Sequence, residues 1–320
     1  MSAPVALSCG EPAGIGPELA VKAWAALRET CPFVWIGDPR HLPAGATFED
    51  ITDLGDAARV SATAMPVLEH PFARPTVPGD ADPANAPGVV AVLERAVALV
   101  QAGDASALCT APIHKKALID GADFAYPGHT EFLAALAGVE RVVMMLASDQ
   151  LRVVPATIHI ALSEVPRALT PDLLRDTLRI TEEGLRRRFG LERPRIAVAG
   201  LNPHAGEGGK MGHEELDWIA PLIAEMQGDG FNVTGPHPAD TLFHAAARAR
   251  YDAAVCMYHD QALIPIKTLD FDRGVNVTLG LPFVRTSPDH GTAFDIAGKG
   301  VANPSSLIEA LKLAQAMAAR

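Results

Sequence analysis

The sequence predicts an α/β protein built on a largely parallel, doubly wound sheet. Short apolar runs rich in β-branched residues alternate with amphipathic segments along the chain, as buried strands joined by helices do. The chain has 320 residues, of which 48% are hydrophobic, and this suffices for one large α/β unit or two smaller domains. In such sheets ligands bind where strands end, so polar residues that follow apolar runs are the candidate site residues.

Seven short runs are the predicted strands, because buried parallel strands read as nearly continuous hydrophobic segments. Their alternation with helical segments favours parallel pairing. They are Val5–Cys9, Phe33–Ile36, Ala107–Thr110, Arg141–Ala147, Val153–Ile160, Arg195–Leu201 and Ala253–Tyr258.

The clearest predicted helix opens at Thr170, a hydroxyl N-cap residue followed by Pro171, which suits the first helical position. Its apolar face keeps helical spacing, and Gly190 is the predicted end. That face consists of Leu174, Leu178, Thr181 and Leu185. In Pro71–Gly88 prolines recur too densely for a helix or a central strand, so a surface connection is predicted. The alanine-rich tail, Ser305–Arg320, is predicted to be a packing helix.

Composition narrows the class of partner. A net charge of -11 without clusters of Lys and Arg argues against nucleic acid, whereas an anionic small substrate remains open if cations gather locally. No run approaches about 18 uncharged apolar residues and the N-terminus lacks a basic n-region, so we expect no membrane span and a cytoplasmic protein. The four cysteines lack a CxxC spacing, which favours free, buried thiols.

Three histidines follow predicted strands, namely His159, His204 and His259. Three imidazoles at strand ends would form a metal site with open positions, as in catalytic zinc sites. Their separations in sequence are long, so a hydrogen-bonded structural histidine at each position is the alternative. His204 lies in LNPHAGEGGKMGH, which contains four glycines. Each glycine costs backbone entropy on folding, so the segment is more typical of a binding loop than of a stabilising element.

Two further motifs join an apolar run to a helix. GEPAGIGPEL places Gly10, Gly14 and Gly16 between a strand and a helix, but the spacing is not GxGxxG and a tight turn explains it almost equally well. In YPGHTE, His129 and Thr130 lie where backbone N–H groups at a helix start are able to hold an anion. The alternative there is simple N-capping by Thr130.

The long segment from YHDQALIPIK to GKGVANP is the densest in polar groups that packing does not require. Lys267, Asn276 and Arg285 fall at intervals through it. Arg and Lys are the residues that a phosphate or carboxylate ligand needs, although each is also common as a solvated surface charge.

Seven motifs in matching order resemble the 4-hydroxythreonine-4-phosphate dehydrogenase family of pyridoxal phosphate biosynthesis, from about residue 4 to about residue 310. They are GEPAGIGPEL, CTAPIHK, YPGHTEFL, LNPHAGEGGKMGHEE, GPHPADTLF, YHDQALIPIK and DHGTAFDIAGKGVANP. The resemblance implies two α/β/α domains around a cleft, like the isocitrate and isopropylmalate dehydrogenases, and a homodimer with the active site at the subunit interface. The implied domains are 1–130 plus 268–320, with both termini and a nucleotide loop, and 131–267, with the metal histidines and the dimer interface.

The resemblance also implies roles for individual residues. His159, His204 and His259 would bind a divalent metal, zinc, cobalt or magnesium, with one ligand from the neighbouring chain. The positions that would contact the phosphorylated substrate are His129, Thr130, Lys267, Asn276 and Arg285. The proton acceptor stays open among Lys267, Asp260 and Asp240, each of which is alternatively a support for the metal histidines.

HGTAFDIAGKGVANP is also similar to the nucleotide loop of the metal-dependent β-decarboxylating dehydrogenases. That resemblance implies that Asp295 takes the ribose hydroxyls, that Asn303 faces the adenine and that Gly291 belongs to the same cofactor loop. A carboxylate at Asp295 would repel a 2′-phosphate, so NAD is predicted over NADP.

The reaction implied is NAD- and metal-dependent oxidation of 4-phosphohydroxy-L-threonine to 2-amino-3-oxo-4-phosphooxybutanoate, which decarboxylates to 3-amino-2-oxopropyl phosphate. The nearest alternative is a sister dehydrogenase acting on 4-phospho-D-threonate or a cyclic diol. An acyltransferase of the phosphate acetyltransferase type and a metallohydrolase are alternatives from other classes. Both would leave nicotinamide absorbance unchanged and the loop Asp295–Asn303 without a purpose.

Overall fold

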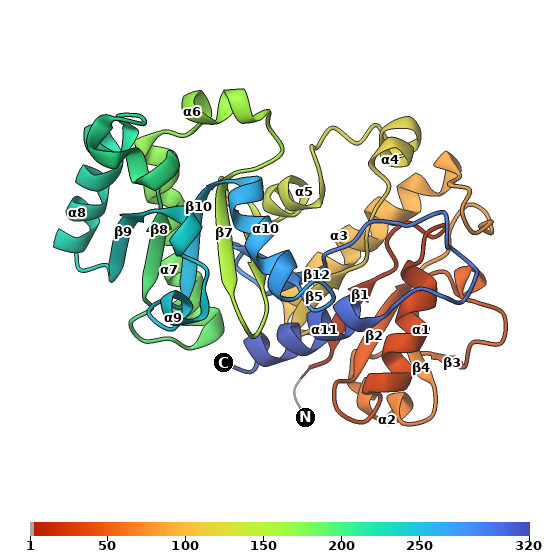
Figure 1. Ribbon diagram of the computed structural model, residues 1–320. Coiled ribbons are helices and arrows are strands. Elements are labelled where there is room, and N and C mark those ends of the chain that lie inside the picture. Colours follow the sequence, from red (N-terminus) through yellow and green to blue (C-terminus); the bar gives the residue numbers. More distant parts are fainter. Residues whose placement is uncertain (1–2) are drawn as a thin grey trace. The chain divides into compact units, whose positions relative to one another are not determined.

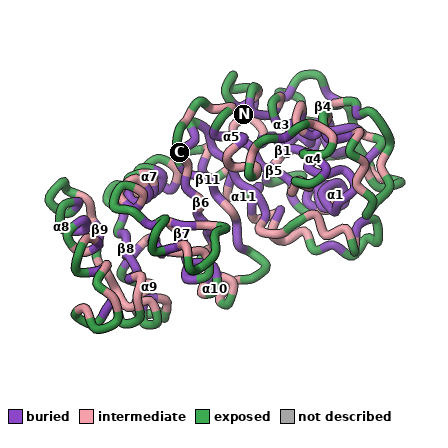
Figure 2. Tube along the Cα trace, turned by 90° about the horizontal axis from the view of Figure 1, so that it is seen from above, coloured by how far each residue is buried: buried purple, intermediate pink, exposed green. Residues whose placement is uncertain are grey.

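The computed structural model describes residues 3–320, and the chain divides into two compact units (Figure 1). The first unit comprises the chain up to Val142 together with Leu281–Ala319. The second unit comprises Val143–Gly280 and Arg320. Each unit has its own strands and helices, and in each the buried residues follow the strands and the packed faces of the helices (Figure 2).

The sheet of the first unit is parallel throughout. Its strand order is β3-β4-β2-β1-β5-β12. The strands are β1 (Val5–Ser8), β2 (Phe33–Gly37), β3 (Phe48–Asp50), β4 (Met65–Glu69), β5 (Ala107–Thr110) and β12 (Arg285–Pro288). The helices are α1 (Gly16–Leu27), α2 (Ala57–Ser61), α3 (Ala86–Ala102), α4 (Lys115–Ala122), α5 (His129–Ala137) and α11 (Ser305–Ala318), with short 3-10 turns at Pro39–His41, Leu54–Asp56 and Pro83–Asn85. Because β1, β2 and β5 are buried at every residue, they read as continuous apolar runs.

The sheet of the second unit is mixed, in the order β11-β6-β7-β10-β8-β9. Its strands are β6 (Val143–Ala147), β7 (Arg152–Thr157), β8 (Ile196–Ala199), β9 (Val233–His237), β10 (Ala253–Tyr258) and β11 (Val275–Leu279). The helices are α6 (Val165–Ala168), α7 (Pro171–Phe189), α8 (Ala220–Gly228), α9 (Ala245–Arg248) and α10 (His259–Leu269), with short helical turns at Leu162–Glu164, Pro203–Gly209, Glu215–Ile219 and Ala239–Thr241. β6 runs antiparallel to both β7 and β11. A short turn joins β6 to β7, and only antiparallel neighbours accept so short a link.

The helix predicted after Thr170 is confirmed as α7. The Thr170 hydroxyl accepts a hydrogen bond from the Leu173 backbone N–H at 3.2 Å, and Pro171 begins the helix. Gly190 ends it in the left-handed conformation, with φ 68°. All four residues of the predicted apolar face are buried, so amphipathic spacing located the core side correctly.

Each of the seven runs predicted as strands forms a strand over at least part of its length, and the tail forms α11 as predicted. Sequence reasoning missed β3, β4, β9, β11 and β12. The segments FED, VTGPH and RTSP, which form β3, β9 and β12, are polar or contain proline and lack a strand pattern. The predicted connection Pro71–Gly88 is wrong at its end. α3 already begins at Ala86 with Pro87 in its first turn, a position where proline is compatible with a helix.

Within residues 3–320, one helix, Pro83–Ala102, is long and apolar enough to cross a membrane by length and composition, with a hydropathy of 1.2. The same property is expected of a core helix. α3 packs against β1, β2 and β5 and buries one face. The four cysteines are free and buried, as predicted.

Candidate functional site

Two of the three predicted metal histidines lie together in the second unit. β7 and β10 are parallel neighbours, with Thr157 opposite Tyr258. His159 follows the end of β7 and His259 is the first residue of α10, directly after β10. Their ring centroids are 5.6 Å apart with the planes inclined by 43°. The rings line a hollow of about 250 Å³.

The backbone and a carboxylate fix these two imidazoles. His159 has a φ of 53°, a left-handed conformation that non-glycine residues adopt rarely. The Nδ1 atom of His259 lies 2.7 Å from Oδ1 of Asp260. Such a contact favours one imidazole tautomer and fixes the orientation of the ring. Asp260, one of the three proton-acceptor candidates, is therefore in direct contact with His259.

His204 opens a left-handed turn. Every residue from His204 to Gly209 has a positive φ, from 41° to 88°. The left-handed helical conformation costs about 1–2 kcal/mol for each non-glycine residue, which explains why half of these six residues are glycine. The glycines of the motif therefore permit a backbone path that ordinary residues resist.

A buried carboxylate holds this turn. Glu215 is 2% exposed and accepts hydrogen bonds from the Asn202 backbone N–H at 2.7 Å and from its side-chain Nδ2 at 2.9 Å. The same Nδ2 also donates to Glu214 at 2.7 Å. A Cβ on Gly206 would lie 2.8 Å from Oε2 of Glu215. Gly206 is therefore required both for its φ and for its close approach to the carboxylate.

The histidine pair supplies two nitrogen donors of the kind that zinc and cobalt prefer. Within residues 3–320 no group of three or more His, Cys, Asp or Glu side chains is arranged to hold a metal ion. His159 and His259 thus fit part of a metal site, and His204 is not gathered beside them to complete it.

The other predicted residues of the second unit are separate features. Lys267 lies in the last turn of α10, with Nζ 5.7 Å from the centroid of the Phe271 ring. Asn276 lies on β11 and is half-buried, and its Oδ1 has no hydrogen-bond partner among the described residues, so this acceptor is available to a ligand. Asp240 is exposed in the turn Ala239–Thr241.

In the first unit, Arg285 is a buried cation at the start of β12. It is 2% exposed, and its Nη2 donates to the Thr110 hydroxyl, at the end of β5, at 2.7 Å. Burial lowers the pKa of the Arg285 guanidinium to about 10, against the opposing charges of Cys109 and Glu131. A guanidinium kept in so dry an environment suits a bound phosphate or carboxylate.

His129 faces the same charge. Burial, and then the charge of Arg285, hold the pKa of His129 well below its ordinary value, so the imidazole is neutral. Its buried Nε2 has no hydrogen-bond partner within residues 3–320. His129 begins α5, and the N-cap is Gly128, so the alternative that Thr130 caps this helix is wrong. Thr130 instead lies in the first turn, where helix N–H groups attract anions.

The predicted cofactor residues of the first unit lie in a loop that runs into α11. Asp295 and Asn303 are exposed, and a Cβ on Gly291 would meet no atom within 4 Å. Oδ1 of Asn303 accepts hydrogen bonds from the backbone N–H and the hydroxyl of Ser305, at 3.0 and 2.7 Å. The asparagine therefore ties the end of this loop to the start of α11.

The GEPAGIGPEL turn contacts this loop directly. The Ile15 N–H donates to the carbonyl oxygen of Thr292 at 3.0 Å. A Cβ on Gly14 would lie 2.9 Å from that same oxygen, and a Cβ on Gly10 only 2.4 Å from the Pro112 carbonyl oxygen. Its glycines thus serve close backbone approach, which sequence reasoning had only described as a tight turn.

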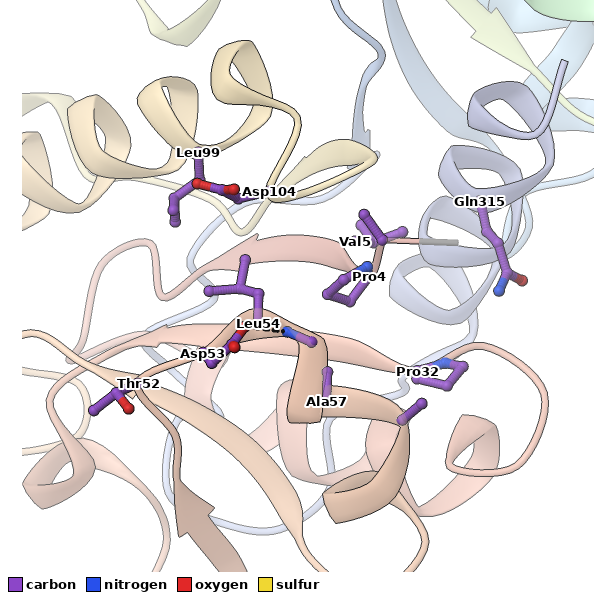
Figure 3. Close-up of a pocket in the computed structure, with 13 residues that line it drawn as sticks. Pro4, Val5, Pro32, Thr52, Asp53, Leu54, Ala57, Leu99, Asp104 and Gln315 are labelled. Atoms are coloured by element: carbon purple, nitrogen blue, oxygen red, sulfur yellow. Dashed lines mark hydrogen bonds between the residues drawn. The ribbon is translucent and has the colours of Figure 1, made fainter. Parts of the chain in front are cut away.

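A separate hollow of about 780 Å³ in the first unit lies where β1 and β2 begin (Figure 3). Pro4 and Val5 line it where β1 begins, and Pro32 lines it just before β2. Its charged lining residues are Asp53 and Asp104, which would repel a phosphorylated ligand. None of the predicted site residues is among those that line it.

Sequence reasoning missed several residues that support the candidate site. Thr110 ends a predicted strand beside Arg285, a position that strand-end reasoning was able to single out. Glu215 was missed because its partner Asn202 is separated from it by a glycine loop that has no regular period. Glu18 was missed because the backbone groups that it binds lie near the other end of the chain.

Comparisons with known proteins point to one family over most of the chain. The sequence model of a family described as "Pyridoxal phosphate biosynthetic protein PdxA" matches residues 29–314. The 4-hydroxythreonine-4-phosphate dehydrogenase of Ruegeria sp. (strain TM1040) is 72% identical over 314 residues, which are 98% of this chain and 96% of that protein.

Solved structures are similar over the same extent. The 4-hydroxythreonine-4-phosphate dehydrogenase of Klebsiella pneumoniae has a TM-score of 0.91 at 39% identity, and covers 99% of this chain and 100% of its own. A terephthalate 1,2-cis-dihydrodiol dehydrogenase of Burkholderia xenovorans LB400 has a TM-score of 0.69 at 30% identity, covering 99% and 98%. The similarity is therefore greater to the enzymes named for the phosphorylated amino acid than to this diol dehydrogenase.

Proposed function

We propose that this chain, which belongs to the PdxA family of pyridoxal phosphate biosynthetic proteins and is an oxidoreductase, oxidises 4-phosphohydroxy-L-threonine with NAD and a divalent metal. The product would be 2-amino-3-oxo-4-phosphooxybutanoate, which decarboxylates to 3-amino-2-oxopropyl phosphate. The observation that carries the proposal is the 72% identity, over 98% of the chain, to a relative named for this activity. NAD and phosphorylated metabolites are abundant in the cytoplasm, where we expect the enzyme to act.

Arg285 is the residue best suited to an anionic group of the substrate. A dry guanidinium oriented by Thr110 has donors in a fixed fork that matches a phosphate or carboxylate. Neutral His129 adds a side chain whose buried Nε2 is able to donate or accept one hydrogen bond. Thr130, Lys267 and Asn276 are the other residues that we propose for substrate binding, and contacts of this kind would orient the secondary alcohol for hydride transfer.

His159, His204 and His259 would hold the metal. A bound divalent ion supplies Lewis-acid polarisation of the oxygen at the carbon that loses hydride. Asp260, whose Oδ1 lies 2.7 Å from Nδ1 of His259, would orient this imidazole and leave its other ring nitrogen for the ion. If Asp260 has this role, the proton acceptor that we propose is Lys267 or Asp240.

A second copy of the chain would complete this metal site, and we place the dimer interface on the second unit. Two observations support this. The described residues of one chain do not assemble three metal ligands. The surface beside the histidine pair and on α10 exposes large apolar side chains, Ile160 at 44%, Leu162 at 68% and Ile264 at 62%. Exposed apolar side chains grouped on one face are typical of an interface.

Mixed dimers test this arrangement. Chains carrying His159→Ala, His204→Ala or His259→Ala are co-expressed in pairs with two different tags, and the doubly tagged dimers are isolated. A mixed dimer regains one intact site only when the two altered positions are ones that different chains contribute to the same site. Three ligands from two chains require two of the three pairings to regain about half of the activity and one metal per dimer. Recovery in none of the pairings would show that each site is built within one chain.

The reaction itself is tested by NADH absorbance. We expect turnover of 4-phosphohydroxy-L-threonine, its loss after chelation, and its return on adding zinc, cobalt or magnesium. Turnover of 4-phospho-D-threonate or of a cyclic dihydrodiol alone would replace the substrate but keep the class of reaction. No absorbance change with any of them would contradict the proposal. A higher kcat/KM with NADP than with NAD would contradict the role given to Asp295.

A further inference from the structure

An ion pair of α1 reaches the loop that precedes Asn303. Glu18 is 7% exposed, and Lys22, one helical turn later, donates to its Oε1 at 2.7 Å. Oε2 of Glu18 accepts from the Gly300 backbone N–H at 3.2 Å, and Oε1 accepts from that of Ala302 at 3.0 Å. Nζ of Lys22 donates to the carbonyl oxygens of the same two residues, at 2.9 and 2.7 Å.

One ion pair thus satisfies four backbone groups, the N–H and the C=O of both Gly300 and Ala302. Charge-assisted hydrogen bonds of this kind are about twice as strong as neutral ones. The residue between the two anchored positions, Val301, is 65% exposed, while Ala302 is 2% exposed. The pair therefore holds the loop on both sides of a residue that points to solvent.

The same helix fixes the loop at its other end. α1 begins at Gly16, directly after Ile15, whose N–H donates to the Thr292 carbonyl oxygen at 3.0 Å. The Gly79 N–H donates to the Ala13 carbonyl oxygen at 2.7 Å, and a Cβ on Gly79 would lie 3.0 Å from the Phe294 carbonyl oxygen. The segment from Thr292 to Ala302 is therefore anchored, before and after Asp295, by the turn and first residues of one helix.

We propose that Glu18 and Lys22 are positioning residues for NAD, because they hold the segment between Asp295 and Asn303 in its binding conformation before the cofactor arrives. The inference rests on the proposed use of this loop by NAD. Neither side chain need touch the cofactor. Ordering a loop on binding costs conformational entropy, and a loop that is ordered beforehand avoids that cost.

The experiment compares Glu18→Gln and Lys22→Met with a matched control, Lys312→Met. Lys312 also forms an ion pair with a glutamate on its own helix, Glu309 at 3.0 Å, but this pair is exposed. Both Glu18→Gln and Lys22→Met are expected to raise the Kd and KM for NAD about tenfold, with kcat and the KM of the phosphorylated substrate changed less than about twofold. Lys312→Met should behave as the wild type, and Lys22→Arg should restore most of the affinity.

Hydrogen exchange in the absence of NAD gives a readout that does not depend on the cofactor. The amides of Gly300 and Ala302 should exchange at least tenfold faster in Glu18→Gln than in the wild type, and at wild-type rates in Lys312→Met. Since Lys22 is partly exposed, Lys22→Met keeps the test available if Glu18→Gln does not fold. Unchanged exchange in both variants, or unchanged NAD affinity despite faster exchange, would overturn the inference.

A third variant separates this inference from the proposed function. Asp295→Ala should weaken NAD binding if the loop holds the cofactor. If Asp295→Ala weakens it and Glu18→Gln and Lys22→Met do not, the positioning role fails while the cofactor site stands. If Asp295→Ala leaves the Kd for NAD unchanged, the cofactor site itself fails and the positioning role falls with it.

Discussion

The left-handed turn after His204 predicts that two glycines in it differ sharply in their tolerance of alanine. Gly206 has a φ of 79° and Gly208 a φ of 65°, so either substitution incurs the left-handed penalty of about 1–2 kcal/mol. A Cβ on Gly208 would meet no atom within 4 Å. A Cβ on Gly206 would lie 2.8 Å from Oε2 of Glu215 and 3.0 Å from the Gly212 carbonyl oxygen. Only Gly206→Ala therefore displaces the buried carboxylate.

The difference between the two variants follows from the bonds that Glu215 makes. Moving its carboxylate loses at least one hydrogen bond to Asn202, and a hydrogen bond to a charged group contributes about 1.5–3 kcal/mol. We expect Gly208→Ala to lower the free energy of unfolding by about 1–2 kcal/mol and Gly206→Ala by about 2.5–5 kcal/mol. Metal affinity should fall in Gly206→Ala, since His204 is part of the same turn.

The assay combines urea denaturation with hydrogen exchange of the Asn202 amide, which donates to Glu215. Gly206→Ala should accelerate this exchange more than Gly208→Ala does. Equal destabilisation by the two variants, to within about 0.5 kcal/mol, would refute the role given to the carboxylate and leave only the backbone penalty.

Three further predictions concern other parts of the site. Thr110→Val removes the hydroxyl that Arg285 binds, so the KM of the phosphorylated substrate should rise about tenfold while the KM for NAD is unchanged in steady-state kinetics. Asp260→Asn should weaken zinc binding about tenfold in calorimetry, because His259 loses the carboxylate that sets its tautomer, and wild-type affinity would contradict that role. His129 has a lowered pKa in the folded protein, so the unfolded chain binds more protons as pH falls below the ordinary value of 6.5. The free energy of unfolding without substrate should therefore fall on acidification from pH 7 toward the lowered folded pKa, and His129→Gln should remove that part of the slope in urea titrations at successive pH values.

Local patterns were enough to predict the elements that are buried and regular. β5 was predicted with its observed bounds, Ala107–Thr110, because all four residues are buried, and α7 because its cap, apolar face and final glycine agree. β12 was not predicted, since a strand beginning with a buried arginine contradicts the apolar pattern. Arg285 was selected only as a polar residue of a dense segment, and its burial was not predicted.

The types of residue in the candidate site were predicted, but the residues that hold them in place were not. Strand-end reasoning located His159 and His259, because β7 and β10 end at the same edge of one sheet. It had no means to find that Glu18 binds Ala302, which lies 284 residues along the chain, since only the fold brings them together. Nor does a glycine count reveal that six consecutive residues adopt left-handed conformations.

The chain order of the first unit has a consequence for synthesis. β12 and α11 are made last, yet β12 pairs with β5 and α11 packs on β1, β5 and β12. Every residue of the second unit except Arg320 is therefore synthesised before the last strand of the first unit, β12, is available to pair with β5. We expect the second unit to acquire protease resistance first on stalled nascent chains. Until β12 is made, the first unit lacks a strand and β5 is an exposed edge. The first unit is most prone to aggregate during this period.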